Sequence, residues 1–224
     1  MPEQVKLKRR HIKDDKFADF MLLARHQVTE NWQMIVIGIV AAGLLVAGMF
    51  WFNNSQKAKQ TEAASILARG LMEFRSGSVQ NAIASLNQVI TDNDNSDAVE
   101  QAVFTLGYIN LTQRNYGEAI KYFEQYSREY RSDKLHLAAA YAGIGQSMEN
   151  QSQFAEAAAK YVEAIKVDTA GALVDDYSLA AMRNYLDAGN TAAAKEQYDN
   201  IVARFPGTET EYRAKLIYAE KVKG

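Results

Sequence analysis

The sequence predicts an all-α protein in which one N-terminal transmembrane helix is followed by an α-solenoid of four helix pairs and a C-terminal capping helix. Three observations indicate this fold class. Residues 34–52 form an unbroken run of apolar side chains and glycine. The remainder of the chain repeats a pattern of small and large residues every 37 or 38 positions. The 224 residues include only two prolines, which suits long helices better than a β-sandwich with many turns.

Residues 1–31 are predicted to form a basic cytoplasmic leader with a short amphipathic helix. Apolar side chains recur there at helical spacing, at Phe17, Phe20, Met21, Ala24 and Val28. Two arrangements of this helix remain open. It lies on the inner leaflet with its basic flank near anionic lipid, or it continues directly into the spanning helix.

Residues 32–53 are predicted to form the transmembrane helix. The 19 residues from Met34 to Phe52 would span roughly 30 Å as a helix, which is the thickness of the hydrocarbon core of a bilayer. Trp32 and Trp51 stand near the two ends of the run, where aromatic belts lie. Bulky residues end the run in place of a small-x-small cleavage site, so we expect an uncleaved anchor. Small residues spaced four apart predict packing against another membrane helix: Gly38 with Ala42, and Gly43 with Ala47.

The distribution of Lys and Arg predicts the orientation of this helix. Seven Lys and Arg residues lie in residues 1–31, and three lie in the twenty residues that follow the apolar run. The positive-inside rule therefore places the N-terminus in the cytoplasm. Residues 54–224 then lie outside, which in a Gram-negative bacterium is the periplasm. The sequence predicts a single-pass protein of the bacterial inner membrane.

Four alanines mark the repeat in residues 54–224. Ala82, Ala119, Ala157 and Ala194 are separated by 37, 38 and 37 residues. A large residue follows each alanine four positions later, and a glycine or methionine precedes it by twelve: Leu86, Phe123, Tyr161 and Tyr198, and Gly70, Gly107, Gly145 and Met182. A fixed period in this range is typical of stacked units, each of which buries its apolar face only against its neighbours.

Each unit is predicted to be a helix–turn–helix. The small residue lets the two helices approach closely, and the large residue fills the groove against the next unit. Asn115 with Glu118, and Thr208 with Glu211, have the spacing of N-terminal capping boxes. Turn signals near 76–78, 114–115, 151–152 and 189–190 separate the two helices of each pair. The predicted units cover about 60–95, 96–132, 133–170 and 171–207, and the cap covers 208–224.

These positions resemble the tetratricopeptide repeat. Its Leu-Gly and Ala-x₃-aromatic positions are occupied by Leu106-Gly107, Ala119 and Phe123 in the second unit, by Ile144-Gly145, Ala157 and Tyr161 in the third, and by Ala194 and Tyr198, followed by Pro206, in the fourth. The period exceeds the usual 34 residues, which implies an extra turn or a longer loop between pairs. With the basic leader and the single spanning helix, the whole chain resembles the bacterial ancillary subunit family of the SecYEG translocon. That resemblance implies association with the translocon and with a membrane-anchored periplasmic chaperone.

The first helices of stacked pairs line a concave surface, which is the predicted partner-binding groove. Paired Lys and Asn side chains that hold acidic chaperone tails are replaced here by apolar residues, so we expect the groove to take an apolar segment of a partner. The alternative is that several of these residues belong to the core. The predicted groove residues are Leu67, Leu71, Phe74, Phe104, Tyr108, Leu111, Gln146, Glu149, Asn150, Arg183, Leu186 and Asp187.

No catalytic, cofactor or metal site is predicted, and no small-molecule substrate. The absence of cysteine excludes thiol catalysis, disulfides and cysteine-ligated zinc. His11, His26 and His136 are far apart in the sequence, and no P-loop, GxSxG, HExxH or GxGxxG motif is present. The acidic stretch from Asp92 to Asp97 lacks the glycine and glutamate of an EF-hand and reads as a solvated loop. A net charge of −2 argues against nucleic-acid binding.

The sequence therefore predicts a protein-binding function and no enzymatic one. The periplasmic repeat domain is expected to recruit a chaperone or client chain near the Sec translocon. The alternative is a structural scaffold subunit of another envelope assembly, such as the machinery of cell division, wall synthesis or the outer membrane.

Overall fold

The computed structural model describes residues 20–21, 25, 31–92 and 97–223. The predicted leader helix falls almost entirely outside these residues, as does most of the acidic loop between Asp92 and Asp97. The chain divides into two compact units, Met1–Lys57 and Ala58–Gly224, and each is described by itself.

Within the first unit, the described residues 31–57 belong almost entirely to helix α2, which runs from Trp32 to Arg75. Among the described helices, α2 is the one long and apolar enough to cross a membrane, judged by length and composition. Its apolar side chains are exposed: Leu45, Phe50 and Trp51 each have more than 70% of their surface accessible. Such exposure in water is unfavourable, whereas in a lipid bilayer the same side chains contact acyl chains.

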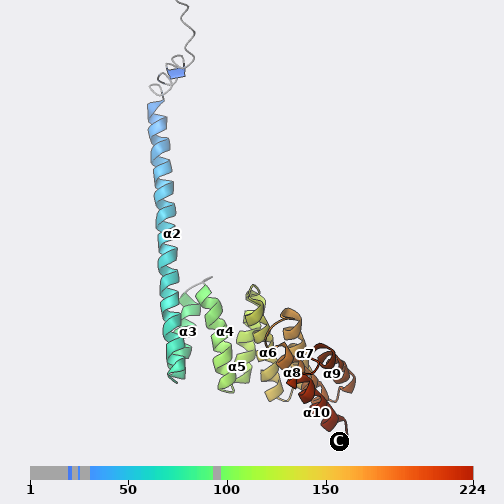
Figure 1. Ribbon diagram of the computed structural model, residues 1–224. Helices are drawn as coiled ribbons and strands as arrows, with labels where there is room; N and C mark the ends of the chain where they lie inside the picture. Colours follow the sequence, from blue (N-terminus) through green and yellow to red (C-terminus); the bar gives the residue numbers. More distant parts are fainter. Residues whose placement is uncertain (1–19, 22–24, 26–30, 93–96, 224) are drawn as a thin grey trace, which may run out of the picture. The chain divides into compact units, whose positions relative to one another are not determined.

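The second unit is all-α in its described residues, as predicted. After the end of α2 it contains α3 (Val79–Asp92), α4 (Asp97–Thr112), α5 (Tyr116–Glu129), α6 (Lys134–Asn150), α7 (Phe154–Val167), α8 (Val174–Asp187), α9 (Thr191–Arg204) and α10 (Glu209–Lys223). Figure 1 shows α3 to α10 following one another in a row. The predicted turns are present at 76–77, 113–114, 151–152 and 188–189, so the helices pair as expected.

The period of the array matches the sequence pattern. The second helices of the pairs begin at Val79, Tyr116, Phe154 and Thr191, which are 37, 38 and 37 residues apart. Contacts between successive units have a different spacing, because most of the hydrogen bonds that join them link residues 34 or 35 apart. Each unit is therefore displaced along its helices by about three residues, close to one helical turn, relative to the unit before it.

Small residues allow close helix packing at the predicted positions. A Cβ atom added at Gly107 would lie 2.8 Å from the ring of Phe123, and one at Gly145 would lie 3.1 Å from the carbonyl oxygen of Ala157. At Gly70 the nearest atoms belong to Leu86, at 3.1 Å. In the first three units the large residue four positions after the alanine thus packs against the glycine twelve positions before it, which confirms the predicted close approach of the two helices of a pair.

Helix caps agree with the prediction in one case and not in the other. The backbone N–H of Glu211 donates to Thr208 Oγ1 at 3.3 Å, and Glu211 Oε2 accepts from the backbone of Gly207 at 2.6 Å. The capping box at Asn115 is wrong, because the Asn115 side chain makes no cap hydrogen bond. The start of α5 is instead fixed by its backbone, since Ala119 N donates to Asn115 O at 3.0 Å.

Helix α10 occupies the place of the first helix of a fifth pair. Thr210 Oγ1 donates to Asp175 at 3.0 Å and Lys221 pairs with Asp187, so α10 repeats the 34–35-residue spacing that joins the earlier units. Buried Ala214 faces α8 and α9, while Tyr212 and Leu216 are exposed. The helix therefore covers the last complete pair, which is the predicted role of a cap.

Candidate functional site: the concave groove

A groove with a volume of about 530 Å³ runs over the first helices of three successive units. Its floor and walls come from α4, α6 and α8, with one side chain each from α5, α7 and α10 and one from the loop before α8. The lining residues are Phe104, Tyr108, Leu111, Phe123, Ala139, Ala142, Gly143, Gln146, Tyr161, Leu173, Asp176, Tyr177, Leu179, Ala180, Arg183 and Arg213.

The 34–35-residue spacing decides which side chains meet in this groove. Phe104 on α4 is followed by Ala139 on α6, 35 positions later, and by Leu173 before α8, a further 34 positions on. Likewise, Leu111 is followed by Gln146 and then Ala180. The groove therefore runs diagonally across the array, moving towards the N-terminal end of each successive helix.

Apolar surface is accessible in the groove, both on α4 and in the loop before α8. Tyr108 is 49% exposed and Leu173 is 44% exposed, although both carry large apolar surfaces. Phe104 is half-buried, because its ring makes edge contacts with Phe123 and Tyr126 at centroid distances of 5.7 and 5.3 Å. The groove residues on α6 include alanines and a glycine, whose small side chains leave room for side chains of a partner. Exposed apolar surface in such a hollow is typical of a binding site.

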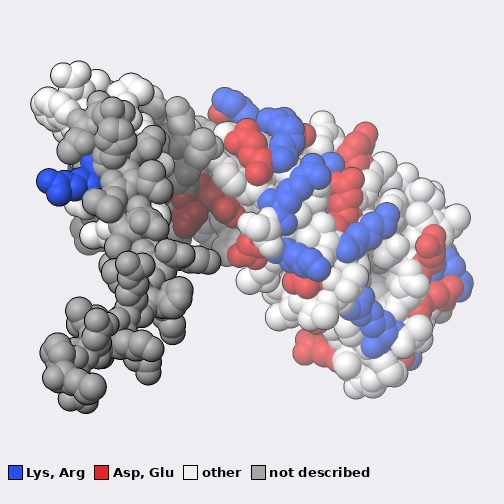
Figure 2. All heavy atoms as spheres, turned by 90° about the horizontal axis from the view of Figure 1, so that it is seen from above, with Lys and Arg blue, Asp and Glu red and all other residues white. Residues whose placement is uncertain are grey.

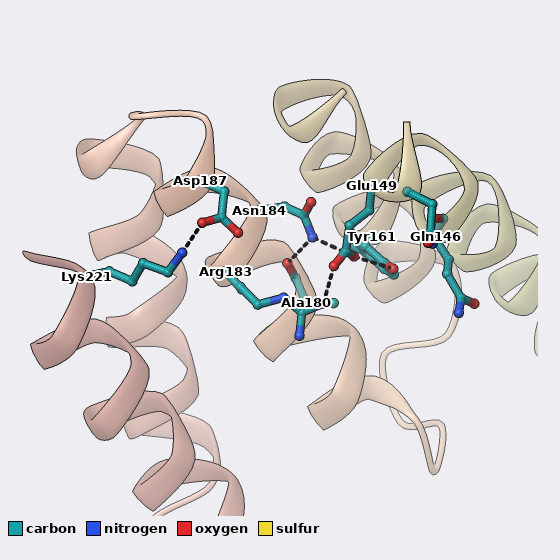
Figure 3. Close-up of polar contacts among 9 residues, drawn as sticks. Gln146, Glu149, Tyr161, Ala180, Arg183, Asn184, Asp187 and Lys221 are labelled. Atoms are coloured by element: carbon teal, nitrogen blue, oxygen red, sulfur yellow. Dashed lines mark hydrogen bonds and ion pairs between the residues drawn. The ribbon is translucent and has the colours of Figure 1, made fainter. Parts of the chain in front are cut away.

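A polar cluster centred on Glu149 borders the groove (Figure 3). Glu149 accepts from Arg183 Nη2 at 2.6 Å, from Asn184 Nδ2 at 2.9 Å and from the Tyr161 hydroxyl at 3.1 Å. Burial raises the pKa of Tyr161, and the charge of Glu149 and its hydrogen bond raise it further. The cluster joins α6, α7 and α8, so it holds the C-terminal wall of the groove in position.

Two arginines provide positive charge at this wall, and both face carboxylates. Arg183 pairs with Glu149, and Arg213 lies 3.8 Å from Asp176. Asn184 is fully buried, and its Oδ1 atom has no hydrogen-bond partner among the described residues. Its Nδ2 atom donates to Glu149 and to the carbonyl oxygen of Ala180, which fixes the orientation of the amide.

The structure places the predicted groove residues in three settings. Phe104, Tyr108, Leu111, Gln146 and Arg183 line the groove. Leu67 is buried in the core, and Leu71 and Phe74 are half-buried against that core. Glu149 belongs to the polar cluster, Asn150 accepts from the Tyr116 hydroxyl at 3.0 Å, Leu186 packs with the C-terminal core, and Asp187 pairs with Lys221. That the groove binds a partner stays a prediction.

Sequence reasoning missed most of the lining from α6 and α8. The 37–38-residue period assigns residues 149–150 and 186–187 to the groove. Spatial neighbours follow the shorter spacing, which selects Ala139, Gly143, Leu173 and Tyr177. The sequence period does not mark this register, because the displacement between units arises from their packing.

Figure 2 shows one face of the helical array, on which Lys and Arg side chains are interspersed with Asp and Glu. In the part of the chain that the structure describes, no group of three or more His, Cys, Asp or Glu side chains is placed to hold a metal ion. The arrangement is suited to contact with another polypeptide through apolar surface and hydrogen bonds.

Comparison with known proteins agrees with the helical array. The search of curated proteins found no match. A solved structure titled MamA of AMB-1, from a P212121 crystal, superposes with a TM-score of 0.54 at 16% sequence identity, over 67% of this chain and 76% of that chain. At this identity the likeness concerns the fold. The family model described as "YfiO: Outer membrane lipoprotein" matches residues 59–221, which include all helical pairs and α10. By this match over most of its length, the chain belongs to the YfiO family of outer membrane lipoproteins.

Proposed function

We propose that this protein is a single-pass inner-membrane protein whose periplasmic repeat domain binds other proteins through the concave groove. The partners that fit best are a membrane-anchored periplasmic chaperone or client chains near the Sec translocon. The observation that carries the proposal is the accessible apolar surface of the groove, where Tyr108 on α4 and Leu173 in the loop before α8 are exposed. Membership of a family of envelope proteins supports a scaffold role for the array.

The proposed attachment is a membrane-spanning helix, whereas the family description names lipoproteins. A lipoprotein carries its lipid on a cysteine, and this chain contains no cysteine. The match to the family begins at residue 59 and so does not include the apolar run of residues 34–52. That run supplies an anchor of its own, and the excess of Lys and Arg before it favours a cytoplasmic N-terminus. The pairs Gly38–Ala42 and Gly43–Ala47 remain a predicted surface for packing against another membrane helix.

Site-specific photo-crosslinking in intact cells tests the proposal. A photoreactive amino acid is placed at Tyr108 or at Leu173 in the full-length protein, and at Lys121 as a control. Lys121 is exposed on α5 and does not line the groove. We expect adducts from the two groove positions, with translocon subunits or an envelope chaperone identified by mass spectrometry. Adducts from Lys121 alone would contradict the proposed use of the groove.

A second candidate function is a structural subunit of another envelope assembly. The family match favours it, because the family is described by its place in the outer membrane. Groove adducts with subunits of cell-division, wall-synthesis or outer-membrane machinery would support this candidate over the first. A periplasm-active reporter fused after residue 224 tests the orientation, and activity only of a cytoplasm-specific reporter would overturn the placement in the periplasm.

A further inference from the structure

A second pocket adjoins the concave groove at Phe104, which lines both. This acidic pocket has a volume of about 250 Å³. It lies between the N-terminal part of α4, the C-terminal part of α5 and the start of α6. Its lining residues are Asp97, Glu100, Gln101, Phe104, Tyr126, Asp133 and His136.

The acidic pocket and the groove occupy one face of the same helices. On α4 the lining residues are spaced three or four apart, in the series Asp97, Gln101, Phe104, Tyr108 and Leu111. On α6 the same spacing joins His136 to Ala139, Gly143 and Gln146. Residues with this spacing share a helix face, so the two hollows form one continuous surface. Along α4 it measures about 21 Å, from a rise of 1.5 Å per residue.

Negative charge converges in the acidic pocket, whose lining contains one histidine and no lysine or arginine. Three carboxylates, those of Asp97, Glu100 and Asp133, come from two helix N-terminal regions. The Tyr126 hydroxyl donates to Glu100 Oε1 at 2.7 Å. Burial raises the pKa of Tyr126, and the hydrogen bond and charge of Glu100 and the charge of Asp133 raise it further, so both carboxylates act on the same wall of the pocket.

The same pocket has an aromatic wall. The ring of Phe104 packs edge-on against Tyr126 at 5.3 Å and against His136 at 4.9 Å between centroids. His136 Nδ1 lies 2.6 Å from Asp133 Oδ2. A wall of this kind contacts the alkyl stem of a lysine or arginine, while the charged head of that side chain reaches the carboxylates.

We propose that the groove takes an extended segment of a partner protein with bulky apolar side chains next to a lysine or arginine. The apolar side chains lie on Tyr108, Leu111 and Leu173, and the basic side chain enters the acidic pocket past Phe104. An extended chain rises about 3.3–3.6 Å per residue, so about six residues follow the 21 Å surface. This inference rests on the proposed function of the groove and adds the charge that the partner carries.

Charge complementarity selects this occupant over an acidic one. The arginines of the opposite wall, Arg183 and Arg213, already face Glu149 and Asp176 within the chain. The carboxylates of the acidic pocket face a tyrosine hydroxyl and one histidine, so a partner cation supplies the missing opposite charge. An acidic side chain brought to Phe104 meets like charge, which is unfavourable at short range.

Peptide binding to the full-length protein in nanodiscs tests the charge preference. Three fluorescent peptides share the same leucines and phenylalanine and differ at one flanking position, which is lysine, serine or glutamate. Fluorescence anisotropy gives their dissociation constants. We expect the lysine peptide to bind roughly tenfold more tightly than the serine peptide, the value of one hydrogen bond between charged groups, and the glutamate peptide more weakly than both. Added salt should reduce these differences.

A matched pair of triple variants locates the effect. Asp97→Asn, Glu100→Gln and Asp133→Asn together remove the charge of the acidic pocket and keep the size and one acceptor oxygen of each side chain. Glu118→Gln, Glu124→Gln and Asp199→Asn change the net charge equally at exposed positions outside both hollows. Only the first triple variant should lose the preference for lysine over serine.

The outcomes separate this inference from the proposed function. Equal affinities for the three peptides, all weakened by Tyr108→Ser, would overturn the charge preference and leave the groove as the binding site. An equal loss of lysine preference in both triple variants would also overturn it, because the effect would then follow net charge alone. Failure of all three peptides to bind would contradict the proposed function itself.

Discussion

The ring of Phe123 in α5 lies against Gly143 of α6 so closely that a Cβ atom added to Gly143 would stand 2.5 Å from Cε2 of the ring. On its other side the ring meets Gly107, where an added Cβ would lie 2.8 Å from Cδ1. Gly107 belongs to the same pair of helices as Phe123, and Gly143 belongs to the next. One buried aromatic ring thus fixes the distance between two successive units.

Gly143→Ala should destabilise the protein by about 1–3 kcal/mol, the usual cost of overpacking a core. The Phe123 ring cannot move away from the new methyl group, because Gly107 and the α4 backbone block the opposite side. Alanine is the better helix former, by about 1 kcal/mol in a helix interior, so any loss measured is a lower estimate of the clash. The free energy of unfolding, from urea titration followed by circular dichroism, checks the prediction.

Gly117→Ala is the matched control for that variant. Gly117 also lies in a helix, but nothing lies within 4 Å of an added Cβ atom there. We expect this variant to be as stable as the parent protein or slightly more stable.

A second variant, Gly143→Ala combined with Phe123→Leu, should recover part of the lost stability. Equal stability of Gly143→Ala and the parent would show that the two units can separate without cost.

The fold was predictable from the sequence because its signals are local and repeated. The uncharged run from Met34 to Phe52 has the length of a membrane span, and the four alanines from Ala82 to Ala194 carry the period of the helix pairs. Each glycine–aromatic pair, such as Gly107 with Phe123, repeats a contact within one unit. Within one helix pair, residues at a fixed separation in the sequence are in contact, so the repeat period is sufficient to predict the helix pairs.

The groove was only partly predictable, because its lining depends on contacts between units. The sequence period of 37–38 residues gives the position of each helix, but the displacement of about one helical turn between units is a property of packing. Leu173 and Tyr177 enter the groove through that displacement, and Glu149 turns towards Arg183 for the same reason. The helix caps show a similar limit. An asparagine precedes both α5 and α9, but Asn190 makes a side-chain cap hydrogen bond and Asn115 does not.

Glu149→Ala should lower the free energy of unfolding by about 2 kcal/mol, because it removes the acceptor of three hydrogen bonds. Arg183, Asn184 and Tyr161 would each lose a partner at a site that is largely shielded from water. Glu149→Gln keeps an acceptor oxygen and should be intermediate. Asp199→Ala, which breaks an exposed ion pair with Lys195, is the control and should cause no measurable loss. Equal effects of Glu149→Ala and Asp199→Ala would contradict a structural role of the cluster.

Asp133 caps α6, and its contribution to stability should depend on pH. Its side chain accepts from the backbone N–H groups of Leu135 and His136 at 2.9 and 3.2 Å. Asp133→Ala should therefore cost about 1 kcal/mol, whereas Asp133→Asn retains a good cap. The hydrogen bond from the His136 side chain, with backbone N–H donors, holds the pKa of Asp133 below its usual range.

The direction of the pH effect follows from that lowered pKa. Below the ordinary pKa of about 3.9 the unfolded chain binds the proton that the folded chain still excludes, so stability falls as pH falls. The contribution is complete above that pKa and is lost as pH passes through the lower, native value. Urea titrations between about pH 6 and about pH 3 should show a smaller loss for Asp133→Asn than for the parent protein. Parallel curves for the two proteins would show that Asp133 does not titrate differently on folding.

Truncation of Phe104 should destabilise the protein much more than truncation of Tyr108, although both line the groove. Phe104→Ala should cost about 2–3 kcal/mol, because its half-buried ring packs on Phe123, Tyr126 and His136. Tyr108→Ala should cost far less, because the side chain is 49% exposed and its ring contact is a single edge contact with Phe74 at 6.1 Å. The structure therefore makes Tyr108→Ala a cleaner test of partner capture than Phe104→Ala. Melting curves and crosslinking yield measured on the same samples separate the two effects. Loss of crosslinking with an unchanged melting curve in Tyr108→Ala is the expected result, and unchanged crosslinking with unchanged stability would mean that this side chain contacts no partner.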